Sequence, residues 1–441
     1  MQYLNEIKNK QITVLGLGVT GLGIVRFLLS HDIAPTVVDS RDVPPGIDWL
    51  NEHAPTLNTR FGDLNNAELL TADIIIISPG LSLTIPAVAK AMSAGVEVIG
   101  DIELFARLND KPVVAVTGSN GKSTVVTLAY DVLKAAGYNV GLGGNIGTAA
   151  LDLLAGDFDV FVLELSSFQL DTTSSLKPIS ATVLNVSEDH LDRYVDYQAY
   201  INSKQTIYTN TALAVVNKKD SATHTDVNPQ VSFALSDADY CLSDYNSEPY
   251  FTAQGKAILP VSTLGVVGSH NQLNALSVMA LLQPFDISAV QFANAFSAFR
   301  GLAHRCQYVT ERHGVKYFND SKATNVGATI AAIDSLSEQA HQLIVIAGGD
   351  AKGADLDALK PHLQDKVKAL ICFGKDARAL VALTDKGHLT LSMQEAVNLA
   401  KQLATYGDYV LLAPACASID MYNNYMQRGE HFVECVHSGE L

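Results

Sequence analysis

The stretch VTGSNGKSTVV, residues 116–126, has the composition of a loop that holds phosphate groups. Gly118 and Gly121 allow backbone N–H groups to turn inward, and Lys122 supplies a point charge for the β and γ phosphates of a nucleotide. The usual pattern begins with an earlier glycine, and here Val116 stands at that position. The stretch therefore predicts a compact phosphate loop between a strand and a helix.

The residues after the lysine extend this interpretation to a metal ion. Ser123 or Thr124 can face Mg²⁺ through a hydroxyl oxygen. A glycine-rich turn with a serine helix cap is the alternative, but it leaves Lys122 unexplained. The predicted ATP-binding set comprises Gly118, Ser119, Asn120, Gly121, Lys122, Ser123 and Thr124.

Three blocks of alternating strands and helices surround this loop. Residues 1–100 contain the runs ITVLGLG (12–18), PTVVDS (35–40), ADIIIISPG (72–80) and VEVIG (96–100), as expected of a Rossmann-like doubly wound parallel sheet. Residues 101–301 predict a mainly parallel, P-loop ATPase-like domain with a small antiparallel flap between residues 220 and 265. Residues 302–441 predict a second Rossmann-like domain, which begins with a hairpin that turns at His313 and Gly314. The predicted fold class is therefore α/β with three domains.

The composition limits the partners of the chain. The formal net charge of −16 disfavours nucleic acid and anionic membranes. The five cysteines are widely spaced, which favours a reducing compartment over a disulfide framework or a zinc site. We expect a cytoplasmic monomer that acts on small molecules, with no nucleic-acid or membrane partner.

A second glycine-rich stretch, GLGVTGLG (16–23), follows the first strand. With Asp39 at the end of the next strand it has the parts of a dinucleotide fingerprint, and alone it would indicate an NAD-dependent oxidoreductase. Its glycines could also serve only close packing of helix and strand. A chain with both loops could bind two nucleotides, one as fuel and one as part of a substrate.

Carboxylates at neighbouring strand ends are candidate ligands for Mg²⁺, which prefers oxygen. Glu164 follows one strand, and Asp189 with His190 follows another. Each alone is better explained as a turn or surface residue, but together they lie where α/β sites form. Lys204, in a helical stretch, is by itself a weak signal.

Polar residues also gather in the second half of the chain. Asn271 and Asn274 are three apart, so both amides lie on one helix face. Several strands of the third block end in polar residues, and one cleft would collect them. These candidates are Arg305, Asp320, Lys322, Thr324, Lys352 and Ser418.

These motifs together resemble the Mur ligases, the ATP-dependent amino-acid-adding enzymes of peptidoglycan synthesis. The likeness covers nearly the whole chain and includes GSNGKST, a short phosphate loop of the family type. The other motifs that carry it are GLGVTGLG, GDIELF, GGNIG, ELSSFQL, NVSEDHLDRY, HRCQ, NDSKATNVG and PACASID.

The resemblance implies a ligase that adds D-glutamate to UDP-N-acetylmuramoyl-L-alanine through an acyl phosphate and a tetrahedral intermediate. The first domain would bind the UDP-sugar, the second ATP, and the third the amino acid while closing over ATP. The UDP part would lie near Thr20, Ser40, Arg41, Ser78 and Gly80, and the sugar-peptide near Asn145.

The resemblance also implies the catalytic and metal residues. Lys122 would bind the triphosphate, and Ser123 with Glu164 would hold one Mg²⁺. His190 would hold a second ion, with Lys204 as a CO₂-derived carbamate. Lys122, His190 and Lys204 are the implied catalytic residues.

The remaining roles implied by the resemblance fall on the third block and its approach. Asn271, Asn274, Arg305 and Asp320 would contact ATP. The D-glutamate residues would be Lys322, Thr324, Lys352, Ser418 and Tyr425, the last where the family has Phe.

Three alternatives stay open from the sequence. The chain could be a sibling ligase for another amino acid or for folate, an NAD-dependent oxidoreductase, or a non-catalytic nucleotide-binding module.

Overall fold

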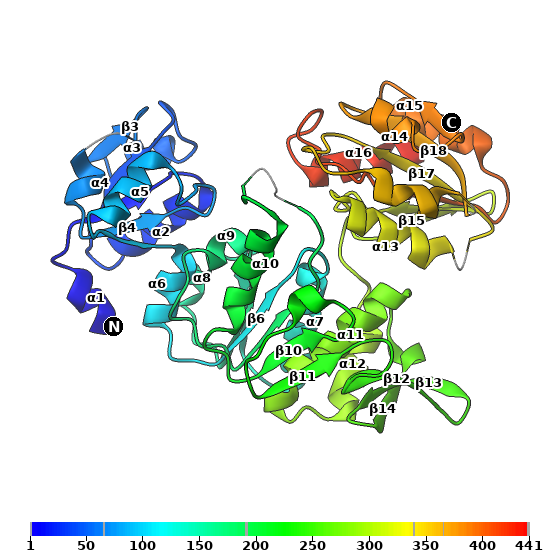
Figure 1. Ribbon diagram of the computed structural model, residues 1–441, viewed down its shortest axis with the longest axis horizontal. Coiled ribbons are helices and arrows are strands. Elements are labelled where there is room, and N and C mark those ends of the chain that lie inside the picture. The colour runs from blue at the N-terminus through cyan, green and yellow to red at the C-terminus, as the bar shows by residue number, and fades with distance from the viewer. Residues whose placement is uncertain (1, 65–66, 190–192, 338–339, 365, 439–441) are drawn as a thin grey trace. The chain divides into compact units, whose positions relative to one another are not determined.

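The computed structural model describes residues 2–64, 67–189, 193–337, 340–364 and 366–438. They form three β-sheets with flanking helices (Figure 1), which confirms the predicted α/β class. The chain makes two compact units. One comprises Met1–Val186, Gln198–Pro260 and Ala275–Phe296; the other comprises Ser187–Tyr197, Val261–Asn274 and Ser297–Leu441.

The first sheet has five parallel strands in the order β3-β2-β1-β4-β5. Its region contains α1 (Gln2–Ile7), β1 (Ile12–Leu15), α2 (Val19–Leu29), β2 (Thr36–Asp39), α3 (Ile47–His53), β3 (Thr59–Phe61), α4 (Ala67–Thr71), β4 (Ile74–Ile77), α5 (Pro86–Ser93), β5 (Glu97–Ile99) and α6 (Asp101–Leu108). Every residue of β1 and β4 is buried, as expected for strands covered on both faces. The chain order reverses between β1 and β4, which is where ligands bind in such sheets.

The second sheet has nine strands in the order β14-β13-β12-β11-β10-β9-β6-β8-β7. Its region contains β6 (Val113–Thr117), α7 (Lys122–Ala135), β7 (Val140–Gly144), α8 (Ala150–Leu153), β8 (Val160–Glu164), α9 (Ser167–Leu170), β9 (Ser180–Val183), α10 (Tyr197–Gln205), η1 (Thr206–Tyr208), β10 (Ala214–Asn217), η2 (Ser221–Thr223), β11 (Gln230–Phe233), β12 (Tyr240–Tyr245), β13 (Glu248–Ala253), β14 (Lys256–Pro260), η3 (Val261–Thr263), α11 (Ser269–Leu281), η4 (Gln283–Phe285) and α12 (Ala289–Ala298).

The register of this sheet positions the phosphate loop. Strand β6 lies between β8 and β9, and Val116 pairs with Glu164 while Thr117 pairs with Val183. The ends of all three strands therefore reach the loop together. Strands β12, β13 and β14 pair antiparallel, which confirms the predicted flap.

The third sheet has the order β15-β16-β20-β17-β18-β19. Its region contains β15 (Gln307–Arg312), β16 (Val315–Asn319), α13 (Val326–Ser337), β17 (Leu343–Gly348), η5 (Asp357–Leu363), β18 (Val367–Phe373), α14 (Ala377–Val381), β19 (Gly387–Leu389), α15 (Met393–Leu403), β20 (Tyr409–Leu412) and α16 (Tyr425–His437). β15 and β16 form the predicted hairpin, with His313 and Gly314 at positive φ in its turn.

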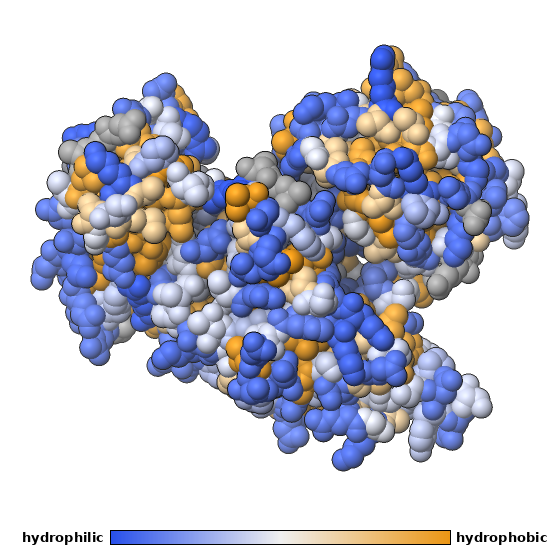
Figure 2. Space-filling view, viewed as in Figure 1, coloured by the Kyte–Doolittle hydropathy of each residue, from blue (hydrophilic) through white to orange (hydrophobic). Residues whose placement is uncertain are grey.

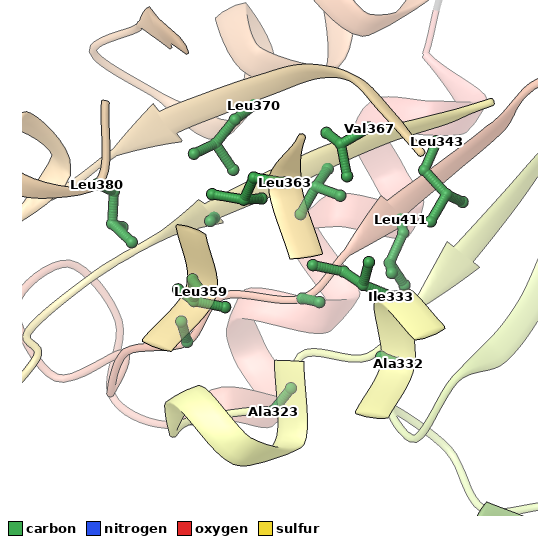
Figure 3. Close-up of a cluster of buried hydrophobic side chains, with 14 of the residues drawn as sticks. Ala323, Ala332, Ile333, Leu343, Leu359, Leu363, Val367, Leu370, Leu380 and Leu411 are labelled. Carbon is green, nitrogen blue, oxygen red and sulfur yellow. The ribbon is translucent and has the colours of Figure 1, made fainter. Parts of the chain in front are cut away.

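Alternate residues of β17 enter two separate cores. Leu343 packs in the cluster of Figure 3, with side chains of α13, η5, β18 and β20. Ile344 and Ile346 pack on the opposite face, against α15 and α16. Because successive strand residues point to opposite faces, this alternation makes the sheet the middle of three layers.

Figure 2 shows one face of the chain, on which hydrophobic residues lie among hydrophilic ones. Within the described ranges, no helix has the length and apolar content needed to cross a membrane.

Candidate active site

The phosphate loop joins β6 to α7 through two glycines at positive φ. Gly118 has φ +148° and Gly121, the N-cap of α7, has φ +85°, both of which L side chains rarely adopt. A Cβ atom on Gly118 would also approach Leu184 Cβ to 3.1 Å. The glycines that predicted the loop are therefore needed both for its turn and for its close packing on the segment after β9.

Lys122 bends back over the loop. Its Nζ donates to the carbonyl oxygens of Gly118 at 2.7 Å and Ser119 at 3.0 Å. The helix dipole of α7 adds partial positive charge at the same end. A lysine and a helix N-terminus side by side form an anion site of the kind that accepts phosphate groups.

Asn185, which was not predicted from the sequence, holds the loop from the segment just after β9. Asn120 N donates to Asn185 Oδ1 at 2.9 Å, and Asn185 Nδ2 donates back to Asn120 O at 3.1 Å. Ser119 N donates to the backbone oxygen of Asn185 at 2.9 Å. The only sequence signal for this residue is an asparagine just beyond a buried strand.

A hydroxyl and a carboxylate meet beside the loop. Ser123 Oγ donates to Glu164 Oε2 at 2.6 Å, and Asn145 Nδ2 donates to Glu164 Oε1 at 2.7 Å. Ser123 and Glu164 are both buried. The oxygen atoms of this pair are the hard ligands that Mg²⁺ prefers, so the residues fit the ion.

Lys204 is not a solvated helix lysine. Its side chain is buried, and Nζ donates to Gly118 O at 3.1 Å while lying 4.5 Å from the centre of the Tyr200 ring. The Tyr200 hydroxyl is 3.3 Å from Ser119 Oγ. Tyr200 was also missed; its signal is its place four residues before Lys204, on the same face of α10.

The other proposed metal residues are placed less fully. His190 lies outside the described residues. Asp189 belongs to the second unit, where its Oδ2 accepts a long hydrogen bond of 3.5 Å from Asn325 Nδ2.

Asp39 stabilises the first glycine loop internally. Its Oδ2 accepts from Leu17 N and from Arg41 Nη2, both at 2.6 Å, and its Oδ1 accepts from Arg41 Nε at 2.8 Å. Burial opposes its ionisation, but these hydrogen bonds outweigh burial and hold the pKa of Asp39 below its usual value. Both carboxylate oxygens are therefore engaged, which does not favour the ribose role that the NAD interpretation requires.

The remaining residues predicted for the UDP group lie in the first turn of α2 and at or just after the ends of β2 and β4, the two strands that flank β1. Ser78, at the end of β4, donates from Oγ to Gly16 O at 2.8 Å and so shapes the turn. Thr20 is half-buried in the first turn of α2. Ser40 and Gly80 are exposed in the loops after β2 and β4.

A cation and an aromatic ring come together at the carboxyl end of β16. Lys322 Nζ lies 4.4 Å from the centre of the ring of Tyr425, which is the first residue of α16. Asp320 lies two residues earlier. Burial raises the pKa of Asp320 to about 7. A hydrogen bond from the backbone of Cys306 and the charge of Arg305 act in the opposite direction and limit this rise in pKa. Thr324 N donates to Lys322 O at 2.8 Å, which closes the turn.

Arg428, the third residue that the sequence analysis missed, ties three loops of this domain together. It is buried, and its guanidinium donates to Ser321 O at 2.8 Å, Cys416 O at 3.1 Å and Gly348 O at 3.2 Å. Burial lowers the pKa of Arg428 to about 10. A lone arginine in a helix predicts a surface position, so no sequence signal marked it.

Lys352 and Ser418 lie in loops next to those that Arg428 connects. Lys352 is exposed at φ +51°, and its N–H donates to Asp350 Oδ1 at 2.9 Å. Ser418 is buried, and its carbonyl accepts from Tyr422 N at 2.8 Å.

Asn271 and Asn274 both lie in α11, three residues apart as predicted. Asn271 Nδ2 donates to Val267 O at 2.8 Å. Arg305 lies before β15, where its N–H donates to Leu302 O at 3.2 Å.

The structure thus gathers two sets of the predicted residues, each within one unit. The loop of residues 118–124 lies with Asn145, Glu164 and Lys204 in the first unit. Lys322 and Tyr425 lie together in the second.

Comparison with known proteins gives matches along most of the chain. Residues 10–100 match the Mur ligase MurD-like N-terminal domain, residues 116–282 the Mur ligase middle domain, and residues 304–416 the Mur ligase glutamate ligase domain.

Two curated relatives and one solved structure illustrate the likeness. UDP-N-acetylmuramoylalanine--D-glutamate ligase of Pseudoalteromonas translucida is 71% identical, with 99% of each chain covered. The protein of the same name from Haemophilus influenzae (strain PittEE) is 46% identical, covering 97% of this chain and 98% of its own. The structure of MurF from Acinetobacter baumannii has a TM-score of 0.64 at 14% identity, with 98% of each chain covered, and shows the shared fold.

Proposed function

Because this chain belongs to the Mur ligase family, we propose that it is the ATP-dependent ligase that adds D-glutamate to UDP-N-acetylmuramoyl-L-alanine in peptidoglycan precursor synthesis. The relatives that share this name match it over nearly its full length. One structural observation carries the chemistry: the buried pair of Ser123 and Glu164 lies next to Lys122 at the start of α7.

The reaction must activate a carboxylate before an amine can attack it. The terminal carboxylate of the sugar-peptide attacks the γ-phosphorus of ATP, and ADP leaves. The amine of D-glutamate then attacks the acyl phosphate, and phosphate leaves from the tetrahedral intermediate. Water would hydrolyse the acyl phosphate, so the enzyme must keep water away from it.

Lys122 supports the first step from its place on the phosphate loop. Its Nζ now rests on two loop carbonyl oxygens. We propose that it exchanges these contacts for oxygens of the β and γ phosphates, where its charge stabilises the in-line transition state.

Two Mg²⁺ ions belong to this proposal. Ser123 and Glu164 would hold one ion, and His190 with Lys204 the second. When bound, the ions offset the negative charge of the phosphoryl group in transfer. Glu164 already has its two oxygens fixed by Ser123 and Asn145, so its orientation costs little to maintain.

We propose further that Lys204 carries a carbamate. Its Nζ and that of Lys122 donate to the same oxygen, Gly118 O. Addition of CO₂ to the Lys204 amine would place an anionic oxygen group beside Lys122, which would attract Lys122 instead of competing with it for the same oxygen.

The UDP group and the amino acid are assigned to the two other predicted sites. The UDP group is assigned to the first glycine loop, with Thr20, Ser40, Arg41, Ser78 and Gly80. The carboxylate of Asp39 is already bonded to Leu17 N and to Arg41, which supports UDP in place of NAD. D-glutamate, whose second carboxylate needs a cation, would bind at Lys322, Thr324, Lys352, Ser418 and Tyr425.

Two experiments test the proposal. The first is to measure phosphate release in the presence of ATP, the UDP-sugar substrate and one amino acid from a panel of D- and L-forms. Release should occur only when the added amino acid is D-glutamate. In thermal melting the UDP-sugar should stabilise the protein and NAD should have no effect. Release with another amino acid would indicate a sibling ligase, and stabilisation by NAD would restore the oxidoreductase alternative.

We place the reaction in the cytoplasm, where ATP and nucleotide-linked precursors are made, and expect a monomer. Light scattering after gel filtration measures the mass directly, and a dimer would contradict this expectation.

A further inference from the structure

We propose that Asn185 is a positioning residue that sets the shape of the phosphate loop for ATP. The inference rests on the proposed function, because ATP is the ligand that the loop would bind. Asn185 itself does not touch the nucleotide in this proposal; it acts through Ser119 and Asn120.

The sheet register brings Asn185 to the loop. Strand β6 pairs with β9 up to Thr117 and Val183, and Leu184 N then donates to Thr117 O at 2.9 Å. Ser119 N donates to Asn185 O at 2.9 Å, so the parallel pairing continues past both strands into the loop. Because the pairing is in register, the residue opposite the loop's first turn is fixed as Asn185.

The side chain of Asn185 then closes a ring of hydrogen bonds with a single residue. Its Oδ1 accepts from Asn120 N at 2.9 Å and its Nδ2 donates to Asn120 O at 3.1 Å. An amide is the one short side chain that both accepts and donates in this way. The peptide groups on both sides of Asn120 are therefore fixed in orientation.

This orientation matters because Lys122 rests on the loop, next to the start of α7. Lys122 Nζ donates to Gly118 O and Ser119 O, immediately before the residue that Asn185 holds. If the turn at Asn120 could rotate, these carbonyls and the start of α7 would lose their fixed direction. Preorganised groups stabilise a ligand's charge without reorganisation on binding.

The substitution Asn185→Ala removes both side-chain bonds and leaves the backbone bond to Ser119. We expect the Kd for ADP and the KM for ATP to rise about 10- to 100-fold, as two lost hydrogen bonds imply. The KM values for the UDP-sugar and for D-glutamate should stay within about twofold, since their predicted sites lie elsewhere.

Asn217→Ala is the matched control. Asn217 is buried, and its Nδ2 donates to Leu184 O at 3.0 Å, one residue before Asn185. It supports the same segment without contacting the loop. This variant should lower the melting temperature and leave the KM for ATP unchanged.

Asn185→Asp provides a second test should the alanine variant not fold. It is nearly isosteric and keeps the acceptor for Asn120 N, but it cannot donate to Asn120 O. It should also weaken ADP binding, measured by titration calorimetry on the full-length protein.

The outcomes separate the two proposals. If the unmodified protein fails to bind ADP, the proposed function fails. If it binds ADP and a folded Asn185 variant binds equally well, or if Asn217→Ala weakens ADP binding as much, the positioning role of Asn185 is wrong.

Discussion

The hydroxyl of Ser123 donates a hydrogen bond of 2.6 Å to Glu164, and it does so from the first turn of α7 to the carboxyl end of β8. A serine hydroxyl and a carboxylate in contact supply oxygen atoms of the kind that Mg²⁺ prefers, and these two residues would hold the first ion of the proposed reaction. The pair also links the start of α7 to the neighbouring strand β8, so the contact stabilises the fold whether or not an ion is bound.

Ser123→Ala should separate these two roles. The variant would lose the magnesium ligand proposed above, so we expect activity to fall at least about 100-fold and the Mg²⁺ concentration for half-maximal activity to rise. It also removes the hydrogen bond from Ser123 to buried Glu164, which costs about 1–3 kcal/mol of stability. ADP formation over a Mg²⁺ titration, together with thermal melting, measures both.

Thr182→Ala is the control for the loss of a buried hydroxyl in this sheet. Thr182 Oγ1 donates to Val215 O at 2.8 Å, away from the loop. It should change the melting temperature but not the Mg²⁺ dependence. If Ser123→Ala kept the Mg²⁺ dependence of the unmodified protein, the metal assignment would fail.

Lys204→Ala is expected to be nearly inactive while folded, and removing bicarbonate should lower the activity of the unmodified protein. The reason is that a carbamate on Lys204 would supply a negative oxygen ligand beside Lys122, which alanine cannot. Lys204→Arg should be equally inactive, because a guanidinium stays protonated and captures no CO₂.

The carbamate can be observed directly by carbon NMR after incubation with labelled bicarbonate. A carbamate signal that is present in the unmodified protein and absent from Lys204→Arg supports the assignment. Full activity of Lys204→Arg would reject it.

Local patterns in the sequence predicted the elements and the ligand loops, but not the residues that hold those loops. Glycines at positive φ and buried apolar strands act over a few neighbouring residues, so Gly118 and Gly121 could be identified directly. Asn185 acts on Asn120 across 65 positions through strand register, and Arg428 acts through tertiary contacts alone. Neither arrangement leaves a local pattern. The burial of Lys204 likewise follows from packing that no helical spacing encodes.

Tyr425 gives a further prediction, since the resemblance implies Phe at the corresponding position. The Tyr425 ring lies over Lys322 Nζ at 4.4 Å, a contact that either aromatic ring can make. We therefore expect Tyr425→Phe to change the KM for D-glutamate less than about threefold. Tyr425→Ala, which removes the ring, should raise it about 10-fold or more. Steady-state kinetics with varied D-glutamate measures both, and equal effects would show that the hydroxyl, not the ring, is important.

Asp101 is a buried acid in the region that joins the first two sheets. It begins α6, and its Oδ2 accepts from Gln169 Nε2 at 3.0 Å. Among the described residues, its Oδ1 has no hydrogen-bond partner. Burial raises the pKa of Asp101 to about 6, opposed by the bond from Gln169 and by backbone N–H groups.

This shift fixes the sign of a pH effect on stability. The pKa in the folded protein lies above the unfolded value of 3.8. The contribution of Asp101 to the free energy of unfolding is therefore fully present below pH 3.8 and is lost as the pH rises through about 6. Between pH 5 and pH 7.5 the loss amounts to about 1–2 kcal/mol.

Asp101→Asn removes the titration, so its melting temperature relative to that of the unmodified protein should rise between pH 5 and pH 7.5. Comparing the variant with the unmodified protein at each pH cancels the contributions that other groups titrating in this range, including Asp320, make to the melting temperature. Asp110→Asn, an exposed change just after α6, should show a constant difference instead. If Asp101→Asn behaved like Asp110→Asn, the carboxyl of Asp101 would be ionised at both pH values, and the expected rise of its pKa in the folded protein would be wrong.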